Sequence, residues 1–236
     1  MLFRSDGALA GCDDDELYLE YCLSESFTFD DGRLKNASFD TSQGFGLRAV
    51  SDEATGYAHA SELSEAALKR AAASVQAVKA GYTGKFSESP AGTNIHLYTD
   101  DNPLNAVDFD VKVQLMKDID AYARAKDDNV RQVSCSLSGE WQVVEILRPG
   151  GEIVRDIRPL VRLNVSLVVG DDDRQETGSD GRGGRTGYLA YLEPAQWQSQ
   201  VDEAYRQAVV NLESVAAPAG DMTVVLGPGS ARKSVV

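Results

Sequence analysis

Cysteine and histidine are scarce in this chain of 236 residues, which has three of the former and two of the latter. Cys12, Cys22 and Cys135 are odd in number and widely spaced, so the sequence predicts neither a disulfide framework nor a CxxC metal clip. His59 and His96 fall in separate segments, whereas a zinc hydrolase usually places two ligands on one helix, as in HExxH. We therefore expect no catalytic residue, no metal ligand and no cofactor within this chain.

Basic charge and long apolar runs are also lacking. The formal net charge is -14, which argues against nucleic-acid binding through a broad basic face. The apolar runs are too short to span a bilayer. Met1 to Gly11 contains no apolar core of signal-peptide length. These features exclude a membrane partner and favour a cytoplasmic location.

Alternating apolar and polar residues dominate the first two-thirds of the chain and predict strands. The pattern is clear over 16–23, extends to Phe27 and Phe29, and returns over 34–39, 44–50 and 56–60. Further strands are expected over 130–137, 140–147 and 153–169, with turns at Ser138-Gly139 and at Pro149 to Gly151. Asp30-Asp31-Gly32 has the composition of a tight turn.

Three segments have helical periodicity. The first begins at Ser61 or Ser64, which are candidate N-caps, and ends before Gly81. The second runs from about Asp110 to Lys126. The third begins near Pro194 and ends by Pro218, before a short buried strand over 222–226. The order of elements predicts an α+β fold in which antiparallel-rich sheets pack with about three main helices.

A segment rich in aspartate and glycine spans Gly170 to Gly187 and is expected to be a loop. Asp171 to Asp173 lacks the glycine that a calcium loop needs at its sixth position, so solvated charge is the preferred interpretation. Gly178 to Gly187 is either a flexible hairpin tip or a surface that contacts a carboxylate or phosphate. Its candidate contact residues are Arg182, Gly183, Gly184 and Arg185.

Several of these segments, taken in order, resemble the TldD/PmbA family of zinc metallopeptidases. The similarity lies in Gln43 to Val50 with Thr55 to Ala58, in Val133 to Glu140, in Asp156 to Arg162, in Gly183 to Tyr188, and in Ala216 to Gly229. The blocks follow the family order from about Leu17 to Gly229. The last block is similar to the lead into the catalytic half of TldD-type members.

The resemblance implies the substrate-enclosing and partner-binding amino-terminal half of a TldD-type peptidase. Such a protein is expected to act on unfolded or modified peptides, to pair with a TldD/PmbA-type homologous subunit as a dimer, and to hold its zinc in an HExxxH helix. No residue of this sequence matches that motif, so the chain is expected to be inactive alone. Extended peptide is the expected ligand.

Two alternatives stay open: a stand-alone, non-catalytic binding or assembly module, and a non-functional truncated product. We assign residues 1–229 to a TldD-like amino-terminal domain and leave open a subdomain boundary near residues 90–110. Residues 230–236 are expected to be a disordered tail without family resemblance.

Overall fold

The computed structural model describes residues 12, 14–51, 54–75, 97–148, 151–171 and 173–225. The expected tail at 230–236, Gly81 and His96 lie outside these residues. The helices and strands, in chain order, are β1 (Asp14–Asp30), β2 (Arg33–Ser51), β3 (Ala54–Ala60), α2 (Glu65–Val75), η2 (Pro103–Asn105), α3 (Phe109–Arg124), β4 (Val130–Leu147), β5 (Ile153–Gly170), β6 (Gln175–Gly184), α4 (Leu189–Leu192) and α5 (Pro194–Leu212).

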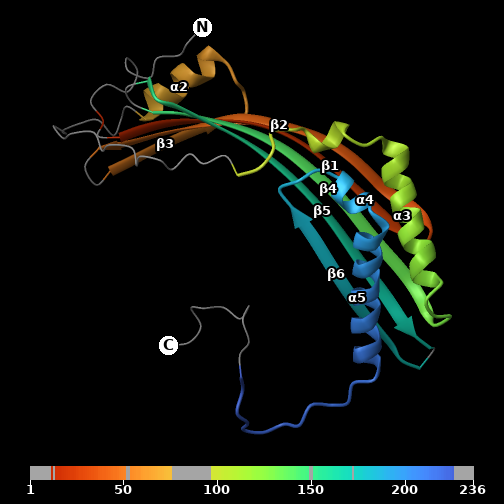
Figure 1. Ribbon diagram of the computed structural model, residues 1–236. Helices are drawn as coiled ribbons and strands as arrows, with labels where there is room; N and C mark the ends of the chain where they lie inside the picture. The colour runs from red at the N-terminus through yellow and green to blue at the C-terminus, as the bar shows by residue number, and fades with distance from the viewer. Residues whose placement is uncertain are drawn as a thin grey trace.

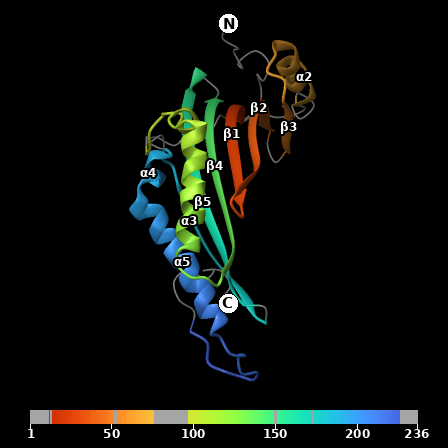
Figure 2. The same cartoon turned by 90° about the vertical axis from the view of Figure 1, so that its right-hand side faces the viewer.

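The strands form a six-stranded antiparallel sheet in the order β3-β2-β1-β4-β5-β6. Its long strands bend into an arch, with α2 near one end and α3 and α5 near the other (Figure 1). Figure 2 shows α3 and α5 side by side in front of the strands. The expected α+β class, with antiparallel pairing and three main helices, is confirmed.

The helices cover one face of the sheet. Leu17 packs with α2, and Phe27 packs with α3 and α5. Both residues lie in β1 and are an even number of positions apart, so their side chains point to the same side of the sheet. Two buried clusters therefore lie under the helices, one beneath α2 and a larger one beneath α3 and α5. The opposite face, called the open face below, has no helix over it among the described residues.

Local chemistry accounts for the turns and helix starts that the sequence predicted. Asp31 and Gly32 have φ of 49° and 72°, so the β1–β2 hairpin uses the left-handed conformations that Asp and Gly tolerate. Of the two candidate caps, Ser64 begins α2, because its Oγ accepts the Ala67 N–H at 3.1 Å. Pro194 is the first residue of α5, as predicted.

Two strands run through positions where the sequence predicted interruptions. β2 is continuous between the predicted 34–39 and 44–50 segments. β4 continues through Ser138 and Gly139, so the turn predicted there is wrong. A Cβ at Gly139 would lie 2.7 Å from Cζ of Tyr188, and the glycine therefore makes room for a ring that packs onto the middle of the strand.

Two further expectations fail. Most of the predicted loop from Gly170 to Gly187 is strand β6. The buried strand expected over 222–226 is also wrong for the residues described, since 222–225 have no strand structure and Val225 is 90% exposed. α5 ends at Leu212, several residues before Pro218. No helix among the described residues is long and apolar enough to cross a membrane.

Candidate functional site

Strand β6 contains most of the glycine-rich segment that the sequence singled out. It lies at one end of the strand order and pairs with β5, with Gly183 opposite Arg162 and Gly184 opposite Val161. A flexible hairpin tip is therefore not what this segment forms. It is an edge strand, and such a strand presents backbone N–H and C=O groups to whatever lies beside it.

Two glycines of β6, Gly178 and Gly181, are explained by close approaches on opposite faces of the strand. A Cβ at Gly178 would collide with the backbone of Ala204 and Ala208, so α5 packs directly against the strand. On the open face, a Cβ at Gly181 would lie 2.6 Å from Oδ1 of Asn164 and 2.7 Å from Nη2 of Arg162. Glycine therefore lets a helix and an arginine approach the same strand from opposite sides.

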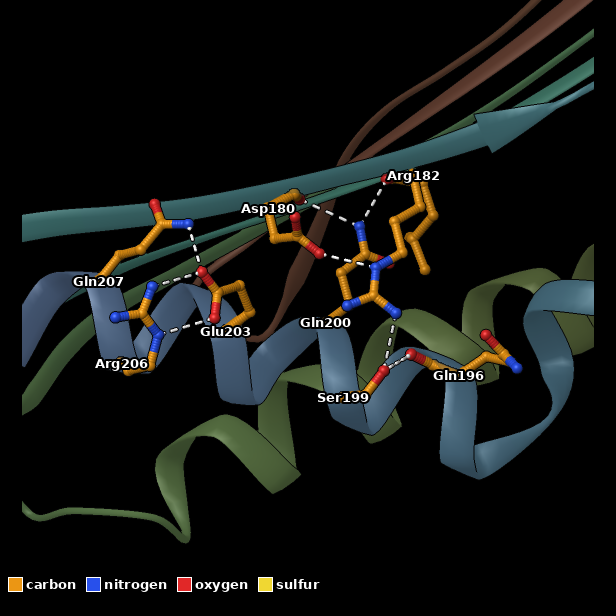
Figure 3. Close-up of polar contacts among 9 residues, drawn as sticks. Asp180, Arg182, Gln196, Ser199, Gln200, Glu203, Arg206 and Gln207 are labelled. Carbon is orange, nitrogen blue, oxygen red and sulfur yellow. Dashed lines mark hydrogen bonds and ion pairs between the residues drawn. The ribbon is translucent and has the colours of Figure 1, made fainter. Parts of the chain in front are cut away.

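Arg182 faces α5 and fixes the strand to the helix (Figure 3). Its Nε lies 2.8 Å from Oδ2 of Asp180, and its Nη1 donates to Oγ of Ser199 at 2.7 Å. Beside it, Gln200 is 1% exposed, and its Nε2 donates to the carbonyl oxygens of Leu163 at 2.8 Å and Asp180 at 3.0 Å. These contacts hold β5, β6 and α5 together, so the edge strand has a rigid backing.

Arg185 lies just after β6, in different surroundings. Its guanidinium carbon is 5.7 Å from the centre of the Tyr98 ring, within the range of a cation–π interaction. Its Nη1 donates to the carbonyl oxygen of Pro159 at 3.5 Å. The Tyr98 hydroxyl in turn lies 3.3 Å from the Asp156 carboxylate. Arg182 thus contacts the helix layer, whereas Arg185 contacts β5 and the segment before η2.

Sequence reasoning missed Ser199 and Gln200. A signal for Gln200 was present, because a glutamine within the apolar face of a predicted helix needs a polar partner when it is buried. Which backbone carbonyls it meets depends on the pairing of β5 with β6, and that pairing was not predicted.

A buried polar cluster lies on the helix face, near the middle of the sheet. Nζ of Lys112 is 2.5 Å from Oε1 of Glu25, and the two side chains are 3% and 0% exposed. The same Nζ donates to the Leu104 carbonyl at 2.8 Å and lies 4.6 Å from the ring centre of Tyr188. Burial, and then the neighbouring Glu25, raise the pKa of Tyr188 well above its ordinary value. The cluster joins β1 to α3 in the core.

The described residues do not fit a metal ion. No group of three or more His, Cys, Asp or Glu side chains among them is arranged to hold one. His59 is exposed and lies 5.6 Å from the Tyr57 ring. Burial raises the pKa of Cys135 to about 12, which keeps its thiol protonated. Asp171 accepts the N–H groups of Asp173 and Arg174 at 2.9 Å and so stabilises the β5–β6 turn.

Two sequence models of one protein family match the chain. The model of the PmbA/TldA metallopeptidase domain 1 matches residues 16–80, and the model of the PmbA/TldA metallopeptidase central domain matches residues 102–212. The first range contains β2, β3 and all but the first two residues of β1, and the second contains β4 to β6. Together they cover more than half of the chain.

Full-length relatives and a solved structure agree with this match. A metalloprotease TldD homolog of Haemophilus influenzae is 40% identical over 222 residues, which are 91% of this chain and 46% of the relative. A metalloprotease TldD homolog of Buchnera aphidicola is 32% identical, also over 91% of this chain and 46% of the relative. The crystal structure of TldE from Thermococcus kodakarensis has a TM-score of 0.66 at 16% identity, over 86% of this chain and 46% of that one. The chain spans about half the length of these relatives.

Proposed function

Because the chain belongs to the PmbA/TldD metallopeptidase family, we propose that it is the region of a TldD-type peptidase that encloses an extended peptide and binds a homologous subunit. Its position in the first half of the relatives suits that role. The described residues do not fit a metal, so no hydrolytic step is assigned to them. A cytoplasmic location and a dimer with a TldD/PmbA-type subunit belong to the same proposal.

Strand β6 carries the proposal. Its residues alternate between exposed and covered, with Thr177, Ser179, Gly181 and Gly183 exposed. An extended peptide can add to such an edge by backbone hydrogen bonds, which tolerate many side chains. The contacts of Arg182 and Gln200 with β5 and α5 keep the edge in place before a peptide arrives, and this lowers the entropic cost of binding.

The polar open face supports enclosure. A large exposed apolar face would promote aggregation or require burial against a permanent partner. Hydroxyl-bearing side chains, in contrast, are stable in contact with water and with a transiently bound peptide. Ser134, Ser136 and Ser138 from β4 alternate with the buried residues of that strand and point to this face. A stand-alone binding module would use the same edge and face, and the chain's association with a full-length homologous subunit separates the two accounts.

Peptide backbone chemistry tests strand addition. An unstructured Gly-Ser-rich peptide and two analogues are titrated separately against the ¹⁵N-labelled chain. One analogue is N-methylated at its odd-numbered residues and the other at its even-numbered residues. Only one edge of a bound strand pairs with β6. We therefore expect one analogue to bind at least about tenfold more weakly, while the other retains its affinity. The NMR chemical-shift changes on binding should centre on residues 177–183. Equal affinity of all three peptides contradicts strand addition.

Metal binding tests the proposal that this chain has no hydrolytic centre of its own. We expect the purified chain, dialysed after exposure to zinc, to retain no stoichiometric zinc and to cleave no casein. A second sample mixed with a full-length TldD-type homologue serves as the positive control for the assay. One tightly held zinc per chain, with cleavage that a chelator abolishes, contradicts the proposal.

A further inference from the structure

A cavity of about 380 Å³ lies on the open face, where β1, β4, β5 and β6 run side by side. Polar side chains from these strands line it, and most of them carry a hydroxyl or an amide. These side chains are Thr28, Ser134, Ser136, Asn164, Ser166, Ser179 and Arg162. All but the arginine are neutral, and the cavity opens to solvent beside the edge strand.

A short relay of hydrogen bonds orients the arginine. Nδ2 of Asn164 donates to Oγ of Ser136 at 3.1 Å, and Oδ1 of the same amide accepts from Nε of Arg162 at 2.8 Å. The guanidinium then lies above the bare backbone of Gly181, where a Cβ would be 2.7 Å from Nη2. The position of the guanidinium therefore depends on both strands that flank β5: on β4 through Ser136, and on β6 through Gly181.

The cavity has hydrogen-bond donors that no other group of the described residues uses. No hydrogen bond or ion pair within the described part of the chain occupies Nη1 or Nη2 of Arg162. The Ser136 hydroxyl accepts from Asn164 and so keeps its own proton to donate. Asp180 lines the cavity with its backbone only, because its carboxylate lies on the helix face with Arg182 (Figure 3).

Two acidic residues flank this part of the open face. Glu140 lies two residues from Ser138, the partner of Arg162 in β4, and Asp30 pairs with Ser134. Asp30 accepts from Oγ of Ser134 at 2.5 Å and from Nε2 of Gln132 at 2.9 Å. These hydrogen bonds, the one from Ser134 above all, lower the pKa of Asp30. Among the described residues Arg162 forms no ion pair with either Glu140 or Asp30, so its guanidinium is the charged side chain of the cavity lining that lacks a counter-ion, although the chain as a whole is strongly acidic.

We propose that this cavity binds a carboxylate, and that the carboxylate belongs to a peptide, either at its C-terminus or on an acidic side chain. Two Nη groups of a guanidinium match the two oxygens of a carboxylate, and the Ser136 hydroxyl supplies a further donor. The peptide identity rests on the proposed function, but the carboxylate chemistry does not. The cavity adjoins β6, so a strand added there brings a terminal carboxylate within reach.

The test compares a short acetylated Gly-Ser peptide that has a free C-terminal carboxylate with the same peptide amidated at its C-terminus. Binding to the full chain is followed by ¹⁵N NMR, including the Nε–H resonance of Arg162. We expect the free carboxylate to bind about tenfold more tightly. Arg162→Gln should abolish this preference. Asn164→Ala should reduce it, because the guanidinium loses its orienting partner.

Arg155→Gln is the matched control, since it removes an arginine from the same strand that pairs with Glu145 away from the cavity. It should keep the full carboxylate preference, and all variants should retain the native NMR spectrum. The inference is overturned if the native chain shows no preference, or if Arg162→Gln retains it. Inorganic phosphate that competes far more strongly than acetate at equal ionic strength would also overturn it. If both N-methylated peptides bind equally while the carboxylate preference persists, strand addition fails and the cavity assignment stands.

Discussion

Nζ of Lys112 lies 2.5 Å from Oε1 of Glu25, although the two residues are 87 positions apart and neither side chain is more than 3% exposed. The pair connects α3 to β1 at the centre of the larger core. Removing two charges from water costs several kcal/mol per ion, and mutual attraction repays this only when further hydrogen bonds satisfy both groups. The Leu104 carbonyl supplies one of these.

Breaking the pair should therefore be costly. Lys112→Met leaves a buried carboxylate without its cation, and we expect a loss of about 3–5 kcal/mol in the free energy of unfolding, measured in urea. The double variant Glu25→Leu, Lys112→Met removes both charges and should recover most of that loss. If the double variant is as unstable as the single one, the pair is not what determines the penalty.

Gly139 should tolerate no larger side chain. In Gly139→Ala the new Cβ would collide with the Tyr188 ring, and we expect destabilisation of about 1–3 kcal/mol from overpacking. Gly187 is the matched control, because a Cβ there meets nothing within 4 Å and the backbone is not left-handed. Gly187→Ala should be neutral or slightly stabilising. Equal effects of the two changes on the urea midpoint would contradict the packing argument.

Burial raises the pKa of Cys135 from 9.0 to about 12, and this predicts an alkaline loss of stability. The unfolded thiol ionises near its ordinary pKa, whereas the native one keeps its proton. The contribution of the Cys135 thiol to the free energy of unfolding is therefore complete below pH 9.0, and it disappears as the pH rises toward about 12. The difference in unfolding free energy between the native chain and Cys135→Ala should narrow over that range. A constant difference contradicts the assignment.

The parts of the fold that local chemistry determines could be predicted from the sequence. Asp30 to Gly32 forms the expected turn, and Pro194 begins the expected helix, because each depends on backbone preferences of the residues themselves. β6 could not be predicted in this way. Its glycines lower strand propensity, and the reason for Gly178 and Gly181 lies in α5 and Arg162, which approach the strand from other parts of the chain.

The candidate site shows the same limit. The sequence identified Arg182 and Arg185 as unusual, but not that one would contact Ser199 on α5 and the other Tyr98. Nor could it show that Arg162, one of many polar residues on an alternating strand, lies over Gly181. That position depends on the pairing of β5 with β6, and the pairing was hidden by the interpretation of β6 as a loop.

The arginines after and within β6 give the last prediction, which concerns association with a homologous subunit. If they contribute to that surface, Arg182→Ala with Arg185→Ala should weaken capture of a full-length TldD-type homologue by about tenfold or more. The intramolecular contacts of Arg182 are at the surface, with its side chain 38% exposed, so the cost in stability should stay below about 1 kcal/mol.

Arg155→Ala provides the comparison, since it removes a charge of the same sign from β5 outside this region. Calorimetry of the mixture and a urea curve for each variant separate lost contact from lost folding. Unchanged affinity in the double variant would leave Arg182 with a purely internal role, fixing β6 to α5. In that case the edge of β6 and the open face are the surfaces to test for subunit contact.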